Sequence, residues 1–95
     1  MFGLTPTDWE IVKTICIDPL KQVGAKVWIY GSRARGDHKR FSDVDILYQG
    51  NPGPLIHSIK EAAEESRLTV KVDLVSINDL AESYRSNVLR DRQEL

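Results

Sequence analysis

Short runs of strand-forming residues alternate with longer amphipathic segments along this 95-residue chain, and that alternation most constrains its fold. Residues 25–30 are few and rich in aromatic and β-branched side chains, which is typical of a strand. Residues 43–48 and 68–75 have the same character. Because helical spacing of apolar residues separates these runs, the pattern predicts a small α+β domain.

The helical segments have recognisable starts and stops. Thr5 is a predicted helix cap, with Pro6 at the first helical position, and Gly24 ends this first helix. Pro19 is expected to kink or interrupt it, because proline removes a backbone donor and crowds the previous turn. A second helix has an apolar stripe made of Leu55, Ile56, Ile59, Ala62 and Ala63. A final helix after the cap Ser76 is expected to carry four residues towards the core: Leu80, Tyr84, Val88 and Leu89.

With a short helical turn after residue 31, the predicted order is helix, strand, turn, strand, helix, strand and helix. There is no internal repeat and no linker-like stretch, so residues 1–95 are interpreted as one domain. A chain of this length buries roughly 65% of its unfolded surface, which is enough for one core.

Composition excludes several classes of protein. The 13 basic and 14 acidic residues give a net charge of -1, so direct nucleic-acid binding is not expected. The lone Cys16 excludes an internal disulfide and a cysteine-rich zinc site, and it is interpreted as a small core residue. Neither a signal peptide nor an apolar stretch of membrane-spanning length is present, so a soluble, cytoplasmic protein without membrane association is expected.

Three aspartates on predicted strands suggest a catalytic site. Side chains alternate across a strand, so Asp43 and Asp45 project from one face and Val44 from the other. In the third run Asp73 lies opposite the apolar face. If the two strands are neighbours, Asp73 joins the pair in a three-carboxylate cluster.

Such a cluster needs positive charge, because adjacent carboxylates repel one another. Oxygen ligands from few protein groups suit magnesium or manganese, and two such ions can assist phosphate chemistry. There are simpler interpretations. An isolated Asp-x-Asp is usually a solvated strand end, and Asp73 could simply pair with Lys71, two positions earlier on an exposed strand face.

The segment 31–36, Gly-Ser-Arg-Ala-Arg-Gly, follows the first strand and has groups that bind phosphate. Gly31 permits close backbone approach, Ser32 offers a hydroxyl and an N–H, and Arg33 and Arg35 supply charge, although only one of them is expected to point inward. The segment is not a P-loop, because residues 37–38 are Asp and His where Lys and Ser or Thr are required.

Aromatic residues leave a further alternative open. Trp9, Trp28 and Tyr30 could stack on a nucleotide base, but aromatic residues in these positions more often belong to a core. His57 and the run 38–40 are interpreted as solvated surface.

Segment 31–36, followed by Ser-Asp-Val-Asp-Ile at 42–46, resembles the signature of the minimal nucleotidyltransferases of the DNA polymerase beta superfamily. The resemblance implies a palm-like fold, a mixed sheet of three to four strands backed by helices on one face with catalysis on the open face. It also implies that Gly31 and Ser32 hold a triphosphate. Asp43 and Asp45 would bind two magnesium ions, and Asp73 would complete the site.

Stand-alone members of this size are similar to the antitoxins of two-gene modules whose toxin is a helical HEPN ribonuclease. The resemblance therefore implies transfer of AMP from ATP to a tyrosine of a HEPN partner, which silences the toxin. Two other hypotheses stay open: a module that inhibits a partner by contact alone, and nucleotidyl transfer to RNA or a small molecule. A homo- or hetero-oligomer is compatible with the sequence.

Overall fold

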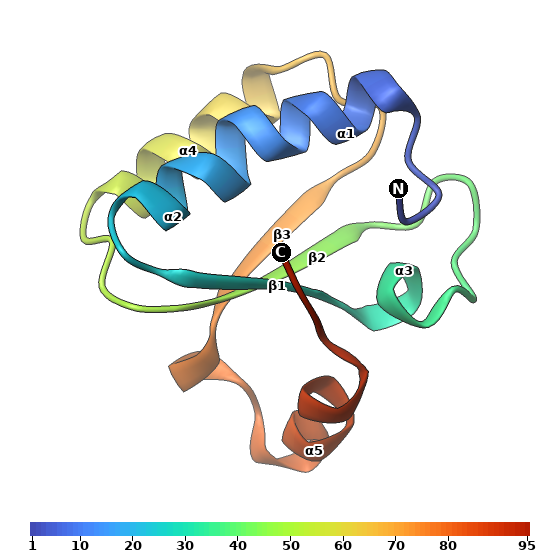
Figure 1. The fold of residues 1–95 in the computed structure, drawn as a ribbon, viewed down its shortest axis with the longest axis vertical. Coiled ribbons are helices and arrows are strands. Elements are labelled where there is room, and N and C mark those ends of the chain that lie inside the picture. The colour runs from blue at the N-terminus through green and yellow to red at the C-terminus, as the bar shows by residue number, and fades with distance from the viewer.

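The computed structural model describes all residues 1–95 and contains the helices and strands expected in an α+β domain, with one further strand at the end (Figure 1). The elements are α1 (Pro6–Val12), the π-helical turn η1 (Lys13–Ile17), α2 (Asp18–Gln22), β1 (Lys26–Tyr30), α3 (Gly31–Arg35), β2 (Val44–Gln49), α4 (Leu55–Glu65), β3 (Val72–Ser76), the 3-10 turn η2 (Ile77–Asp79), α5 (Glu82–Asp91) and β4 (Gln93–Glu94). The predicted α+β class is confirmed.

The four strands form one mixed sheet in the order β3-β2-β1-β4. Strand β1 is antiparallel to both β2 and β4, whereas β2 and β3 are parallel and are joined through α4. Strand β1 ends where α3 begins, and β2 begins after the 36–43 loop. Both of these strand ends therefore lie near the start of β3. This arrangement brings residues 30, 45 and 73 into one row across three strands.

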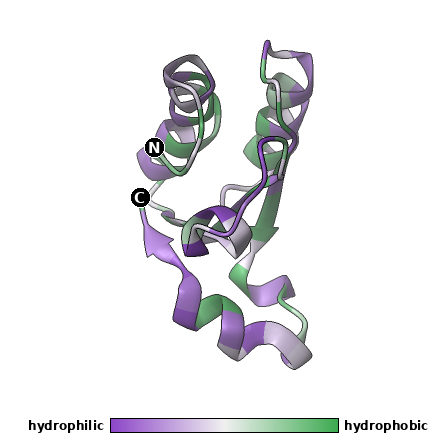
Figure 2. Cartoon of the chain, turned by 90° about the vertical axis from the view of Figure 1, so that its right-hand side faces the viewer, coloured by the Kyte–Doolittle hydropathy of each residue, from purple (hydrophilic) through white to green (hydrophobic).

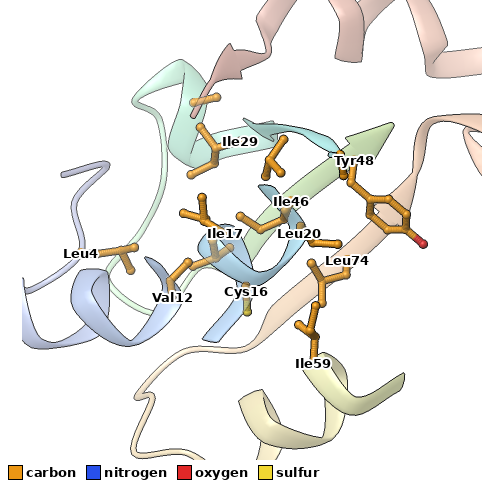
Figure 3. Close-up of a cluster of buried hydrophobic side chains, with 14 residues drawn as sticks. Leu4, Val12, Cys16, Ile17, Leu20, Ile29, Ile46, Tyr48, Ile59 and Leu74 are labelled. Atoms are coloured by element: carbon orange, nitrogen blue, oxygen red, sulfur yellow. The ribbon is translucent and has the colours of Figure 1, made fainter. Parts of the chain in front are cut away.

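Helices α1, α2 and α4 cover one face of the sheet and enclose the main core (Figures 1 and 3). Alternate strand residues such as Val27, Ile29 and Ile46 point into this core because side chains alternate along a strand. Cys16 lies fully buried among them, as predicted. The cluster contains Leu4, Val12, Cys16, Ile17, Leu20, Ala25, Val27, Ile29, Ala34, Val44, Ile46, Tyr48, Ile59 and Leu74.

Helix α5 and η2 lie on the other face, where a second apolar cluster forms. Trp28 and Leu47 point to this face and meet Ile77, Leu80 and Val88. In Figure 2, α5 is mostly hydrophilic, with a short apolar patch, which fits a helix that buries only part of its surface. The sequence predicted helices on one face of the sheet only. Helix α5 additionally covers part of the opposite face, which carries the aspartates.

The N-terminal helical segment contains the predicted cap and the predicted interruption. The Thr5 hydroxyl oxygen accepts a hydrogen bond from the Asp8 N–H at 3.1 Å. Before Pro19, the backbone widens into a π turn in which the Asp18 N–H bonds the Lys13 carbonyl. Proline has no N–H for the regular helical bond, so the wider turn lets the helix continue past it.

Two expectations about the later elements are wrong. The third strand begins at Val72 and not at residue 68, because the N–H and hydroxyl of Thr69 bond the buried Asp8 carboxylate and draw this segment towards α1. Tyr84 is 54% exposed, although it was expected in the core. Only Val88 of α5 is buried, because the first turns of the helix extend beyond the small second cluster.

The last residues form a fourth strand, β4. Gln93 and Glu94 pair with Ile29 and Trp28, and the Arg92 guanidinium lies over the Trp28 ring at 4.4 Å from its centroid.

None of the helices is both long and apolar enough to cross a membrane.

Candidate active site

Tyr30, Asp45 and Asp73 form a row on the face of the sheet that α5 partly covers. Asp45 is the register partner of Tyr30 in β1 and of Asp73 in β3. Side chains at paired positions point to the same face, so the predicted proximity of Asp45 and Asp73 is observed. Asp43 lies just before β2 and is exposed, whereas Asp45 is partly buried.

The row concentrates negative charge. Burial, followed by the charges of Asp73 and Asp43, raises the pKa of Asp45 to about 6, while Arg35 opposes the shift. Burial and the charges of Asp45 and Asp73 likewise raise the pKa of Tyr30 to about 12, so its phenol remains protonated at neutral pH. Negative charge at the row therefore outweighs positive charge, which is the electrostatic condition that favours a bound cation.

The donor atoms fit a hard divalent cation, because they are carboxylate oxygens. No three His, Cys, Asp or Glu side chains converge closely enough to form a metal site by themselves. A magnesium or manganese ion here would therefore complete its coordination with waters and substrate phosphates, as magnesium usually does. The ion pair that the sequence suggested for Asp73 is also present, because Lys71 Nζ lies 3.6 Å from Asp73 Oδ1. Both side chains are exposed, and exposed ion pairs of this kind contribute little to stability.

Gly31 packs directly against Asp45. Its φ of +74° is in the left-handed region, and a Cβ atom at this position would collide with the Asp45 carboxylate. A side chain is excluded here for both reasons. Ser32 follows at the second position of the five-residue α3, so the first residues of the 31–36 segment lie beside the carboxylate row.

Arg33 is not available to a substrate phosphate, contrary to the prediction that placed it in the nucleotide site. It is 2% exposed and donates three hydrogen bonds to backbone carbonyls: Nε to Ser42 at 3.0 Å, Nη1 to Phe2 at 2.9 Å and Nη2 to Arg40 at 3.2 Å. The short helix turns Arg33 towards the 40–42 loop and the N-terminus. Nothing in the local sequence indicates where these carbonyls lie.

Arg35 is the arginine that points towards the site. It faces Asp45 closely enough to oppose the rise in that residue's pKa. Its guanidinium also lies 3.2 Å from Asp37 and 3.7 Å from Asp91, and it is partly exposed. The expectation that only one of the two arginines points inward therefore agrees with the structure.

Two cavities border the end residues of the row, Tyr30 and Asp73. One of about 270 Å³ is bounded by Tyr30, Gly31 and Arg35 and, from α5, by Tyr84, Asn87, Val88 and Asp91. The other, of about 500 Å³, lies between α4 and β3 and is lined by Asp73, Lys71 and Lys60 among others. Sequence reasoning did not identify the α5 residues, because no local pattern shows that a helix some 50 residues later packs beside Gly31.

The remaining aromatic and histidine candidates lie away from the row. Trp28 is buried in the second cluster, and Trp9 packs against Phe2 beside the main core. His57 is exposed on α4, as expected for a surface residue. Of the three aromatic residues that could have met a base, Tyr30 alone borders a cavity at the row.

With this geometry in place, comparison with known proteins identifies the family. Residues 10–95 match the family model described as the nucleotidyltransferase domain. The chain belongs to the nucleotidyltransferase domain family. Because the match includes both segment 31–36 and Asp43 to Asp45, the carboxylate row and Gly31 belong to the matched nucleotidyltransferase domain.

Relatives of this nucleotidyltransferase domain agree in sequence and in fold. The Haemophilus influenzae protein named probable protein adenylyltransferase MntA is 36% identical over 80 residues, which span 79% of this chain and 67% of the relative. A solved minimal nucleotidyltransferase superposes with a TM-score of 0.69 at 32% identity, over 94% of this chain and 93% of its own. A toxin-antitoxin structure with AMP-PNP shares the fold, with a TM-score of 0.63 at 23% identity over 86% of this chain and 70% of its own.

Proposed function

We propose that this nucleotidyltransferase domain transfers AMP from magnesium-bound ATP to a hydroxyl group of a partner protein and acts as an antitoxin. The observation that carries the proposal is the packing of Gly31 against Asp45. It places a segment suited to phosphate directly beside carboxylates suited to metal, within a chain of the nucleotidyltransferase family. A phosphoryl substrate that contacts both would have its reacting phosphorus between them.

In this proposal Gly31 and Ser32 hold the outer phosphates of ATP. The missing side chain at Gly31 lets the phosphates approach the backbone, and the Ser32 hydroxyl donates a hydrogen bond to them. Arg35 neutralises charge that develops on the leaving pyrophosphate, because it is the arginine that faces the row. Arg33 takes no part, since carbonyl oxygens occupy its donors.

Asp43, Asp45 and Asp73 would hold two magnesium ions together with the substrate phosphates, with manganese as an alternative. When bound, such ions supply charge stabilisation for the attacking and leaving oxygens. Asp73 also accepts the proton from the acceptor hydroxyl, because it lies at the side of the row that faces away from Gly31. The acceptor oxygen then bonds to the α-phosphorus as the bond to pyrophosphate breaks on the Gly31 side.

A protein acceptor is supported by the relative named as a protein adenylyltransferase. The specific partner, a tyrosine of a HEPN toxin, comes from the resemblance to the antitoxins of such modules. Because the proposed reaction uses ATP, we propose that it takes place in the cytoplasm. The near-balanced charge of the chain gives no reason to prefer an RNA acceptor.

Intact-mass spectrometry tests the proposal. The purified chain is incubated with magnesium, ATP and a HEPN protein as the candidate partner, and both masses are measured. We expect the partner to gain one or more AMP units with the wild type and with Asp18→Asn, a control carboxylate in α2. The gain is expected to fall at least 100-fold with Asp43→Asn and to vanish with EDTA.

Substantial transfer by Asp43→Asn would contradict the assignment of the metal ligands. A stable complex without any mass change would overturn the enzymatic proposal and favour inhibition by contact. Transfer to RNA or to a small molecule, with the partner unmodified, would retain the chemistry and correct the acceptor.

A further inference from the structure

The cavity of about 270 Å³ beside Gly31 has a wall that the proposed chemistry does not use. Four residues of α5 form this wall, and Tyr84 and Asn87 are the exposed ones among them. Tyr30 and Gly31 form the opposite side. The cavity therefore opens directly from the segment proposed to hold the triphosphate.

The wall is fixed in place by contacts at the end of α5. Arg35 lies 3.7 Å from Asp91, which ties α3 to α5. The Gln93 side chain donates a 2.7 Å hydrogen bond to the Ala34 carbonyl, and Arg85 donates one to Ile77 at 3.1 Å. These bonds hold α5 against α3 and η2, so the cavity is formed before any ligand enters.

The groups that line the cavity suit a nucleoside better than they suit phosphate. Tyr30 and Tyr84 present aromatic rings, Val88 is apolar, and Asn87 carries an amide that can both donate and accept hydrogen bonds. The one cation, Arg35, is assigned to the leaving pyrophosphate, and the lining also includes the anionic Asp91, which disfavours phosphate inside the cavity. Bases are recognised by stacking on aromatic side chains and by amide contacts to their edges.

The position of the cavity also favours the donor over the acceptor. In-line attack places the acceptor oxygen opposite the leaving pyrophosphate. With the outer phosphates at Gly31, the acceptor approaches from the opposite end of the row, where Asp73 lies. The cavity at Gly31 is then left for the nucleoside part of the donor.

We propose that the cavity between Gly31 and α5 binds the base and ribose of the nucleotide donor, with Tyr84 stacking on the base and Asn87 contacting its edge. This inference rests on the proposed function, because it assumes that phosphates lie at Gly31. It explains why Tyr84 stays 54% exposed on a helix whose apolar residues are otherwise turned to the sheet. An amide at this position favours adenine, since Asn can bond N6 and N7 of that base together.

Calorimetric titration with three probes tests the inference: magnesium ATP, magnesium GTP and inorganic tripolyphosphate with magnesium. The variants are Tyr84→Ala, Tyr84→Phe and Asn87→Ala, with Ser83→Ala as a control on an exposed α5 residue outside the cavity lining. Tripolyphosphate reports the phosphate site alone. The difference between ATP and tripolyphosphate reports the nucleoside.

We expect Tyr84→Ala to weaken ATP binding roughly tenfold and to leave tripolyphosphate affinity unchanged, as the loss of one stacked base predicts. Tyr84→Phe should bind ATP like the wild type, because the ring remains. Asn87→Ala should reduce the preference for ATP over GTP at least fivefold, and Ser83→Ala should change nothing.

Equal weakening of ATP and tripolyphosphate by Tyr84→Ala would overturn the inference, and so would unchanged ATP affinity in both alanine variants. Wild-type binding of tripolyphosphate that matches binding of ATP would overturn it while sparing the proposed phosphate site. If the wild type binds neither ATP nor tripolyphosphate, both the inference and the proposed function fail.

Discussion

At the scale of single residues, the charge of Asp45 in the candidate site lowers the stability of the folded protein. It lies between Tyr30 and Asp73 in the sheet and in contact range of Gly31. Burial and the neighbouring aspartates raise its pKa from 3.8 to about 6, so its ionised form is disfavoured in the native state. At neutral pH this carboxylate therefore destabilises the metal-free protein relative to a neutral side chain of the same shape.

Replacing Asp45 by Asn should stabilise the metal-free protein at neutral pH. The native state binds Asp45's proton more tightly than the unfolded state, so wild-type stability falls as pH rises from about 4 to about 6. The full shift corresponds to about 3 kcal/mol, and solvent screening of this partly exposed group reduces the expected gain to about 1 kcal/mol.

Urea denaturation in EDTA at pH 7.5 and at pH 4 measures the effect of Asp45→Asn. The gain should be present at pH 7.5 and largely absent at pH 4, where the wild-type carboxylate is protonated in the native state. Asp18→Asn serves as the control outside the row. A loss of stability at both pH values would show that Asp45 makes native contacts whose stabilising effect exceeds the cost of its buried charge.

At the scale of elements, α3 and the loop before β2 are joined by one side chain. Arg33 binds the carbonyls of Arg40 and Ser42 in the loop and that of Phe2 at the N-terminus. Ser42 directly precedes Asp43, so the bonds from Arg33 help to place the first aspartate. Arg33, which lies in segment 31–36, therefore helps to position Asp43 through the backbone of the loop.

Arg33→Ala should lower the free energy of unfolding by about 2–4 kcal/mol, because it leaves three carbonyls without their donor. Arg33→Lys should not restore stability, since one ammonium cannot reproduce the planar fork of a guanidinium. Chemical denaturation measures both, with the exposed Arg67→Ala as control. If Arg33 instead contacted phosphate, these variants would weaken ATP binding and leave stability unchanged.

At the scale of the whole molecule, two apolar clusters of unequal size lie on the two faces of a four-stranded sheet. The larger cluster, under α1, α2 and α4, holds the fold together (Figure 3). The smaller one attaches α5 to the face that also carries the carboxylate row. The face that carries the carboxylate row is therefore open at one end and covered at the other.

Cys16 reports on the integrity of the larger cluster. Its side chain is fully buried, and burial raises the pKa of its thiol to about 11. Reaction with a disulfide reagent at pH 8 should therefore be at least 100-fold slower in the native protein than in urea, because it requires opening of the core. Fast labelling of the native protein would show that the α1–α2 layer opens independently of the sheet.

Local patterns were sufficient for much of this protein. Short runs of strand-forming residues identified β1 and β2, alternation predicted that Asp43 and Asp45 share one face, and Thr5 and Pro19 act locally as predicted. These features depend on residues a few positions apart, so a short stretch of sequence contains their physical cause. The Gly-Ser segment and the Asp-x-Asp are of this kind, and they were sufficient to suggest the family.

Only the tertiary structure decided which side chains meet. The pairing of Asp45 with Asp73, the turning of Arg33 away from the site, and the placing of Tyr84 beside Gly31 each join residues far apart in the sequence or depend on such contacts. The same holds for β3, which starts late because Thr69 bonds Asp8. Sequence determined the local elements and their chemistry, whereas packing between distant segments determined which of those groups share a site, because such contacts leave no signal in local spacing.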